Sequence, residues 1–315
     1  MRGLWIEDGR TTFREDLERP QPEPRSAQAE CRVAVLRAGV CATDLALQRG
    51  YMGFRGIPGH EFVGRALDGP LAGQRVVGEI NAACGTCSAC LTGNGRHCAQ
   101  RTVLGILNRS GAFAEELCLP AANLHPVPEE ISTDAATFVE PLAAAFEIVE
   151  QVDLDSVGSA LVVGDGRLGL LIAQVLGTRV ANLELYGRHP ERAAGLACEL
   201  AWCASPREKA YELVVEATGD PELLTRALGW VRPRGTLVLK TTAERPASLD
   251  LSPLVVDEIT LLGSRCGPFE PALAALADGS VRVEPMIHAR FPLEQGCAAM
   301  ERAAERGVLK VLLTI

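Results

Sequence analysis

The chain has 315 residues, of which 47% are hydrophobic and 4% aromatic, and its formal net charge is -9. This charge argues against nucleic acid or an anionic membrane as a partner, because both repel an acidic surface. No apolar run approaches the roughly 20 residues that a membrane-spanning helix needs, and the N-terminal residues lack the apolar core of a signal peptide. Eleven cysteines in such a chain indicate metal ligation in a reducing compartment, and we expect the cytoplasm.

The length exceeds one ordinary hydrophobic core, so we expect two domains. Before about residue 140, short β-branched runs broken by Gly and Pro predict a β-rich, barrel-like unit. From about residue 160, strands alternate with helical segments, which predicts an α/β unit with a doubly wound parallel sheet. The expected strands start near residues 160, 183, 213, 235 and 259, and the last 30 residues read as strand, helix and strand.

Four cysteines lie within one short, glycine-rich stretch of the first unit. They are Cys84, Cys87, Cys90 and Cys98. Two residues lie between the first and second and between the second and third, and seven residues lie between the third and fourth. Two-residue spacing lets thiolates converge on one ion, and four sulfurs complete the tetrahedral coordination of Zn²⁺. Such a closed site would stabilise the fold without catalysing a reaction. The alternatives are a pair of disulfides, or thiols that serve as small apolar residues.

A second group of metal-binding residue types is spread along the first unit. Cys41 and His60 are suitable zinc ligands, and a third could come from Glu61 or from Glu140. Three protein ligands would leave one position open for water or substrate. Taken singly, each residue is more often a buried or solvated side chain, but their joint presence favours a catalytic metal site.

A glycine-rich turn joins the first expected strand of the second unit to a helix. The pattern is Gly164-Asp165-Gly166-Arg167-Leu168-Gly169. In that context Gly164 allows the tight turn, Gly166 lets the backbone approach a pyrophosphate and Gly169 permits close helix–strand packing. The helix start would then meet the phosphates of a dinucleotide. The alternative is an ordinary turn between a strand and a helix.

The end of the next strand bears on which dinucleotide binds. NAD sites usually place Asp or Glu there, but this chain has Gly187 followed by Arg188 and His189. Gly187 leaves room, and Arg188 could pair with a 2′-phosphate through its planar guanidinium, with His189 adding charge. The sequence therefore favours NADP over NAD. The alternative is a solvated Arg188 and a site indifferent to the phosphate.

Together these motifs resemble the zinc-containing medium-chain dehydrogenase/reductase superfamily, the zinc alcohol dehydrogenase-like group. The matching segments are 39–44, 59–64, the four cysteines, 140–143, 164–169 and 215–219, and the resemblance runs from about residue 30 to the C-terminus. It implies a GroES-like catalytic domain (1–140, completed by 284–315) and a Rossmann nucleotide-binding domain (141–283), with the active site in the cleft between them. It also implies a homodimer or homotetramer formed through the Rossmann sheet edge near 259–263.

The resemblance assigns roles to individual residues. Cys41, His60 and a carboxylate from Glu61 or Glu140 would bind a catalytic zinc, beside the one structural zinc per subunit. Thr43 would bond the substrate oxygen, and Asp44 would orient the ligand histidine. Ala217 and Thr218, with Arg167 and Leu168, would join the cofactor contacts. Many relatives carry a proton-relay histidine five residues after the ligand cysteine, where this chain has Ala46.

The function implied is a zinc-dependent oxidoreductase that transfers a hydride between an alcohol or polyol, or the corresponding ketone or aldehyde, and NADP. Two alternatives stay open. One is an NAD-dependent dehydrogenase of an amino alcohol or hydroxy-amino acid. The other is a zinc- and nucleotide-binding sensor or structural protein without catalysis, which the missing relay histidine keeps open.

Overall fold

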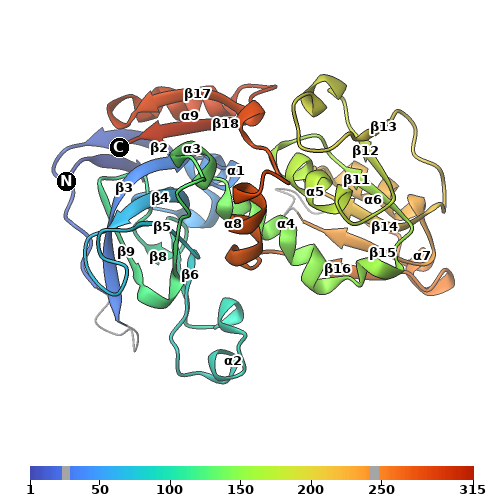
Figure 1. Ribbon diagram of the computed structural model, residues 1–315, viewed down its shortest axis with the longest axis horizontal. Helices are drawn as coiled ribbons and strands as arrows, with labels where there is room; N and C mark the ends of the chain where they lie inside the picture. Colours follow the sequence, from blue (N-terminus) through green and yellow to red (C-terminus); the bar gives the residue numbers. More distant parts are fainter. Residues whose placement is uncertain (23–28, 241–247) are drawn as a thin grey trace. The chain divides into compact units, whose positions relative to one another are not determined.

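The computed structural model describes residues 1–22, 29–240 and 248–315. These residues form two compact units: residues 1–140 with 286–315, and residues 141–285. The first unit is rich in strands and the second alternates strands with helices (Figure 1). Helix α4 (Val139–Gln151) begins in the first unit and continues into the second. No helix of the described residues is both long and apolar enough to span a membrane.

The main sheet of the first unit has seven strands among the described residues. Its order is β10 (Leu124–Pro126), β5 (Arg75–Gly78), β4 (Glu61–Ala66), β3 (Glu30–Gly39), β18 (Lys310–Thr314) and β17 (Ile287–Pro292), while β9 (Glu116–Pro120) also pairs with β3. Strand β3 has three neighbours because β9 and β18 pair with different parts of it, and between those parts, at Val35 to Arg37, its register with β4 shifts. Beyond that bulge it pairs with β18 instead of β9.

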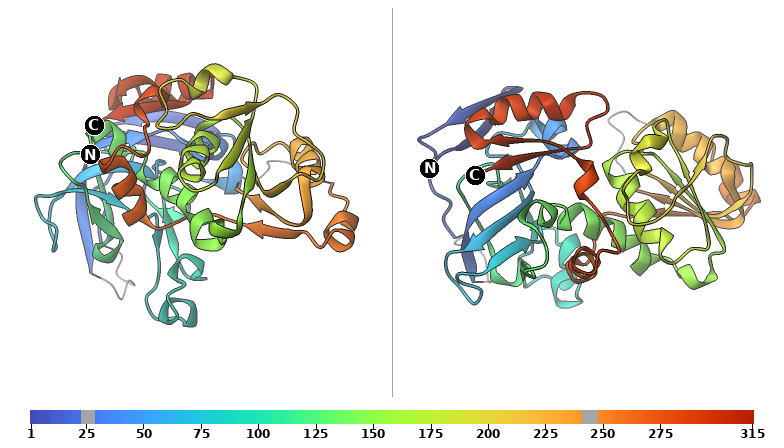
Figure 2. Two further views of the ribbon diagram at one scale, coloured as in Figure 1. Left: turned by 45° about the vertical axis from the view of Figure 1, so that its right-hand side comes forward. Right: turned by 45° about the horizontal axis from the view of Figure 1, so that its top comes forward.

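The C-terminal strand–helix–strand segment belongs to this sheet. Strands β17 and β18 are parallel and are joined by α9 (Gly296–Ala304), which packs against both strands (Figure 2). Ala299, Met300 and Ala303 form the buried face of α9. Strand β18 then brings the C-terminus antiparallel to β3, so residues 273 to 277 positions apart in the chain become neighbours in the sheet.

Two smaller sheets complete the first unit. The hairpin of β1 (Gly3–Glu7) and β2 (Arg10–Arg14) turns at Asp8-Gly9, where both residues have positive φ, as the tight hairpin turns require. The third sheet contains β6 (Asn81–Ala82), β7 (Thr102–Leu104) and β8 (Asn108–Arg109). Between β6 and β7 a lobe that carries the short helix α2 (Ser88–Leu91) extends away from the sheets of this unit (Figure 1).

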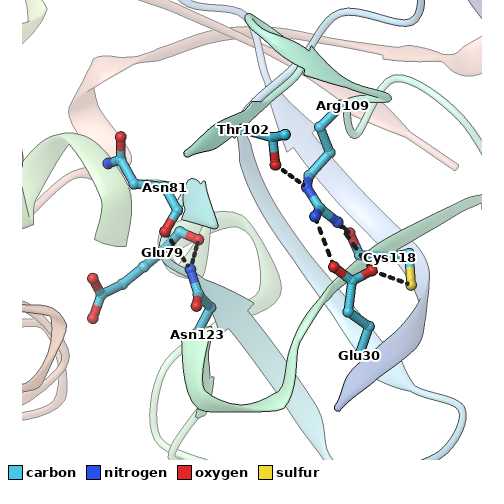
Figure 3. A network of polar contacts seen from close by, with 7 residues as sticks. All are labelled: Glu30, Glu79, Asn81, Thr102, Arg109, Cys118 and Asn123. Carbon is cyan, nitrogen blue, oxygen red and sulfur yellow. Dashed lines mark hydrogen bonds and ion pairs between the residues drawn. The ribbon is translucent and has the colours of Figure 1, made fainter. Parts of the chain in front are cut away.

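A buried ion pair joins the third sheet to the main sheet. The guanidinium of Arg109 donates to both carboxylate oxygens of Glu30 at 2.7 and 3.2 Å, to the hydroxyl of Thr102 and to the carbonyl of Cys118 (Figure 3). The side chains of Arg109 and Glu30 are 9% and 1% exposed. A bidentate pair with these further acceptors satisfies charges that burial would otherwise penalise.

The second unit contains a six-stranded sheet among the described residues, and every pairing in it is parallel. The order is β13 (Ala201–Cys203), β12 (Asn182–Tyr186), β11 (Ser159–Val163), β14 (Tyr211–Glu216), β15 (Val231–Leu239) and β16 (Thr260–Gly263). The expected parallel α/β sheet is confirmed. Strand β13, three residues long and at the edge of the sheet, is not among the strands expected from the sequence.

Helices cover the sheet as the alternating pattern predicts. Helix α5 (Arg167–Gly177) packs against β11 and β12, and α6 (Pro221–Trp230) packs against β14 and β15. Asp220 caps α6 by accepting a hydrogen bond from the N–H of Glu222. Pro221 occupies the first helical position, where a backbone N–H would have no acceptor within the helix, so the N–H that proline lacks is not missed. The remaining helices are α1 (Ala42–Gln48), α3 (Thr133–Ala136), α7 (Ser252–Val256) and α8 (Phe269–Ala277). Short 3-10 turns lie at Tyr51–Gly53, Gly95–His97, Ala121–Asn123, Leu154–Ser156, Pro190–Ala193, Glu284–Met286 and Leu293–Gln295.

Candidate metal centres and nucleotide site

Three of the predicted metal ligands lie together in the first unit. The sulfur of Cys41, a ring nitrogen of His60 and a carboxylate oxygen of Glu61 are all within 4.8 Å of one another. Cys41 is the N-cap of α1, and Glu61 is the first residue of β4, directly after His60. His60 and Glu61 are 3% and 1% exposed. Glu140, which lies in the first turn of α4, is not a member of this group of described residues.

Asp44 links the segment that carries Cys41 to the segment that carries His60 and Glu61. Its carboxylate is fully buried and accepts hydrogen bonds from the backbone N–H of Cys41 at 2.8 Å and from that of Gly59 at 3.1 Å. The same carboxylate lies 3.3 Å from Nδ1 of His60. With Nδ1 facing the carboxylate, Nε2 is the ring nitrogen left for a metal. Asp44 therefore ties the start of α1 to the segment before His60 by hydrogen bonds, and its carboxylate lies beside the His60 ring.

The electrostatics of the cluster favour a cation. Burial lowers the pKa of His60, but the negative charges of Asp44 and Cys41 more than offset this and hold the pKa well above its usual value. The hydroxyl of Thr43 lies 3.8 Å from the sulfur of Cys41, on the same turn of α1. The donor set of thiolate, imidazole and carboxylate is that of an open zinc site, so the residues fit a zinc ion.

Lys310 is a member of the site that the sequence analysis missed. It begins β18, its Nζ donates to Oε2 of Glu61, and both side chains are 2% exposed. The ammonium also lies 5.2 Å from the centre of the Phe138 ring. A signal existed in the sequence, because a lysine inside the apolar run 308–313 is unusual in a buried strand. Glu61 thus has a cationic partner in addition to its place beside Cys41 and His60.

The four cysteines of the lobe also lie together, and all four are free thiols. Their sulfurs are 3.9 Å apart for Cys84–Cys90, 3.5 Å for Cys87–Cys90 and 3.7 Å for Cys87–Cys98. Four sulfurs bound at about 2.3 Å in a tetrahedron around zinc would be roughly 3.8 Å apart. The cluster therefore fits a structural zinc closely, and the disulfide alternative is not what the structure shows.

The thiols of this lobe differ in acidity. Hydrogen bonds from the backbone and the hydroxyl of Thr86 lower the pKa of Cys84 to about 6. Desolvation and the neighbouring thiol of Cys87 raise the pKa of Cys90 to about 11. Sulfurs this close compete for protons because adjacent thiolates repel each other, and a bound cation would remove that repulsion.

In the second unit, the glycine turn has the geometry that a dinucleotide needs. Gly164 has φ +118°, and a Cβ at Gly169 would lie 1.9 Å from the carbonyl oxygen of Gly164, so both positions require glycine. A Cβ at Gly166 would meet no atom within 4 Å. Gly166 is the N-cap of α5, so the helix starts toward open space, which suits an approaching pyrophosphate. Arg167 and Leu168 form the first turn of that helix.

The other predicted cofactor residues lie beside this turn. A Cβ at Gly164 would be 2.9 Å from Cγ2 of Thr218 and 3.0 Å from the carbonyl oxygen of Ala217, which follow β14. A Cβ at Gly187, after β12, would be 2.5 Å from Cβ of Asp165. Strands β12, β11 and β14 are neighbours in the parallel sheet, so their carboxyl ends meet at one edge. The residues present fit a dinucleotide there.

Of the remaining residues in this group, Arg188 is exposed and His189 is half-buried. The backbone N–H groups of both donate to one carboxylate oxygen of Asp165. The sequence pattern assigns no role to Asp165, which lies between Gly164 and Gly166. Its contacts depend on the separation of β11 and β12 in the folded sheet, so the sequence offered no direct signal for them.

Comparison with known proteins identifies the class. Residues 27–129 match the family model described as Alcohol dehydrogenase GroES-like domain. The chain is 30% identical to L-threonine 3-dehydrogenase of Streptomyces coelicolor over 99% of this chain and 96% of that protein. It is 27% identical to the starvation-sensing protein RspB of Escherichia coli, with 95% of each chain covered.

Solved structures agree with these relatives. The alcohol dehydrogenase TADH of Thermus sp. ATN1 superposes with a TM-score of 0.85 and is 27% identical, with 100% of this chain and 99% of that chain covered. The rspB alcohol dehydrogenase of Escherichia coli, solved with NADH, gives a TM-score of 0.86 at 26% identity, over 100% of this chain and 99% of the other.

The chain therefore belongs to the zinc-containing medium-chain dehydrogenase/reductase superfamily, with a GroES-like domain and a Rossmann domain. Within it, the protein is an oxidoreductase of the NAD(P)-dependent, zinc alcohol dehydrogenase-like kind.

Proposed function

We propose that this protein catalyses the reversible oxidation of a small alcohol or polyol to the corresponding ketone or aldehyde, at the cluster of Cys41, His60 and Glu61. The observation that carries the proposal is the placement of these three ligand atoms within 4.8 Å of one another, with Asp44 behind the histidine. Relatives named sorbitol dehydrogenase and D-arabinitol dehydrogenase 1, at 24% and 26% identity, support a polyol.

Zinc would supply Lewis-acid polarisation of the substrate oxygen, and the nicotinamide would supply the hydride acceptor. Cys41 and His60 would hold the metal with a carboxylate from Glu61 or Glu140. Asp44 keeps the His60 ring oriented, and Lys310 compensates the charge of Glu61. Thr43, 3.8 Å from the sulfur of Cys41, would accept the proton of the substrate hydroxyl and pass it toward solvent. Because Ala46 has no ionisable group, water or a ribose hydroxyl would carry that proton onward.

The domain roles belong to the same proposal. Residues 1–140 with 284–315 would form the catalytic domain and residues 141–283 the nucleotide-binding domain, with one catalytic and one structural zinc per subunit. The dinucleotide would contact the glycine turn at 164–169, the residues at 187–189, and Ala217 and Thr218. The preference for NADP predicted from Arg188 stays a prediction, and it depends on that arginine being available to a 2′-phosphate.

We also propose that the protein acts in the cytoplasm as a homodimer or homotetramer. Strand β16 lies at the edge of the parallel sheet, and Val255 and Val256 of the preceding helix α7 are each 78% exposed. An edge that no other described strand covers, beside exposed apolar side chains, is a surface that a second copy can cover. Light scattering after gel filtration would measure the mass, and a monomer at micromolar concentration would contradict this part of the proposal.

A second candidate substrate class is an amino alcohol or hydroxy-amino acid. The similarity to L-threonine 3-dehydrogenase, at 30% identity, favours it. Neither this alternative nor a non-catalytic sensor is better supported than the alcohol and polyol assignment. A panel of alcohols, polyols and hydroxy-amino acids, assayed with both dinucleotides, would separate the substrate classes.

The proposed site is tested with Cys41→Ser and His60→Ala. We expect each variant to lose turnover by at least about a thousandfold while it keeps dinucleotide binding, because the cluster and the glycine turn lie in different units. Cys297→Ser is a matched control, since this half-buried thiol donates to the carbonyl of Thr11 and is not a member of the cluster. Turnover at the wild-type level in either ligand variant would refute the assignment.

A further inference from the structure

The carboxylate of Asp165 has an unusual set of partners. Its Oδ2 accepts hydrogen bonds from the backbone N–H of Arg188 at 2.9 Å and from that of His189 at 2.6 Å. Arg192 donates to the carbonyl of Asp165 at 3.0 Å, and its guanidinium lies 3.4 Å from Oδ1. The side chain of Asp165 is 13% exposed. It links the glycine turn after β11 to the segment after β12.

This carboxylate occupies the space that a side chain at position 187 would take. A Cβ built on Gly187 would lie 2.5 Å from Cβ, 2.6 Å from Cγ and 3.0 Å from Oδ2 of Asp165. In dinucleotide sites, the residue at the end of the second strand is usually an acid that hydrogen-bonds the 2′-hydroxyl of the adenosine ribose. This chain has glycine at that position, and the side chain of Asp165 reaches the space beside it from the neighbouring turn.

The cations of the segment after β12 are largely compensated by acids. Arg192 faces Asp165, and Nδ1 of His189 lies 3.4 Å from the carboxylate of Glu191. The backbone N–H groups of Arg188 and His189, which could otherwise bind an anion, already donate to Asp165. A 2′-phosphate would bring roughly two negative charges next to that carboxylate. Exposed Arg188 would have to offset this repulsion from a position open to solvent.

We propose that Asp165 determines the dinucleotide specificity: it supplies from the glycine turn the carboxylate that β12 lacks, accepts the 2′-hydroxyl of the adenosine ribose, and makes the site prefer NAD over NADP. This inference rests on the proposed dinucleotide function of the unit. It is opposed to the NADP preference expected from Arg188, which took no account of the Asp165 side chain beside position 187, and the titration below decides between the two.

The test measures binding by isothermal titration calorimetry on the zinc-loaded protein, with NAD, NADP and the 2′-deoxyadenosine analogue of NAD. Wild type should bind NAD at least about tenfold more tightly than NADP, and should lose about tenfold for the deoxy analogue, as expected for one hydrogen bond to a charged group. In Asp165→Asn the carboxamide oxygen can still accept from the two N–H groups while the charge is gone. This variant should shift the NAD:NADP preference toward NADP by about a hundredfold and show little loss for the deoxy analogue.

Glu191→Gln is the matched control. It removes one negative charge from the same segment, but the side chain of Glu191 is 72% exposed, and its ion-pair partner among the described residues is His189. We expect its preference to stay within about threefold of wild type. A melting curve of each variant checks that it is folded.

Three results would overturn the inference: tighter binding of NADP by wild type, an equal loss of both dinucleotides in Asp165→Asn, or no loss of affinity for the deoxy analogue in wild type. The first and third are decided even if the variant proves unstable, because wild type alone shows its preference and whether it loses affinity for the deoxy analogue. If wild type bound neither dinucleotide, the proposed function itself would fail.

Discussion

The buried pair of Lys310 and Glu61 gives the sharpest stability prediction. The two side chains are 2% exposed and come from β18 and β4, which are separated by 249 positions in the chain. Replacing Lys310 with Met keeps the volume of the side chain but leaves the Glu61 carboxylate buried without its cation. Breaking one partner of a buried pair costs about 3–5 kcal/mol.

This loss in the free energy of unfolding corresponds to a lower melting temperature. In a unit of this size each kcal/mol lowers the melting temperature by roughly 2–4 °C, so Lys310→Met should melt about 6–20 °C below wild type. The double variant Lys310→Met/Glu61→Gln should recover most of that loss, because the uncompensated charge is then gone. Differential scanning calorimetry measures both after the zinc at Cys41, His60 and Glu61 has been removed by chelation, because a zinc ion bound there would itself compensate the Glu61 carboxylate.

An exposed pair provides the control. Lys209 donates to Asp257 at 2.7 Å, but the lysine side chain is 57% exposed. Lys209→Met should therefore cost less than about 1 kcal/mol. A Lys310→Met protein that melted within 2 °C of wild type, or a double variant no more stable than the single one, would show that the pair does not compensate a buried charge.

Three further predictions concern the cysteines and the glycine turn. Cys87→Ser should reduce bound zinc by one ion per subunit and lower the melting temperature. Cys118→Ser, which is outside the cluster, should leave the zinc content unchanged. Equal zinc content in the two variants would contradict the structural site. Burial raises the pKa of the Cys118 thiol to about 12, so the thiol stays protonated at pH 8.5. It should therefore resist iodoacetamide at that pH in the folded protein, which peptide mass mapping measures. Rapid labelling of Cys118 would argue against its burial. Gly169→Ala should lose dinucleotide binding and should lower the free energy of unfolding by about 1–3 kcal/mol, because its Cβ would meet the carbonyl of Gly164. Gly166→Ala should lose binding but keep the melting temperature of wild type. An unchanged melting temperature in both variants would refute the packing argument.

Motifs whose members are close in sequence could be predicted well. The cysteines at 84, 87, 90 and 98 converge because a lobe of 15 residues has few ways to arrange them, and the glycine turn sets its own backbone geometry. The alternation of strands and helices after residue 160 predicted the parallel sheet, since it reflects burial of each strand on both faces. The hairpin at 3–14 was missed, although its Asp8-Gly9 turn is a strong local signal.

Contacts between distant segments needed the fold. The pairing of Lys310 with Glu61 depends on β18 inserting beside β3, and that position depends on the bulge between Val35 and Arg37. The sequence could not choose between Glu61 and Glu140 as neighbours of Cys41, and the structure places Glu61 in the cluster. A spacing pattern contains no information about which strands become neighbours at such separations.

The sequence by itself determined the class of chemistry, because metal ligands and glycine turns must have particular residue types at short, fixed spacings. Only the tertiary structure decided how individual charges are compensated. Asp165 reaches the backbone of Arg188 and His189 because β11 and β12 lie side by side in the sheet. The interaction of two charges depends on their separation in space and on their burial, and neither quantity is a property of the chain until the strands have paired.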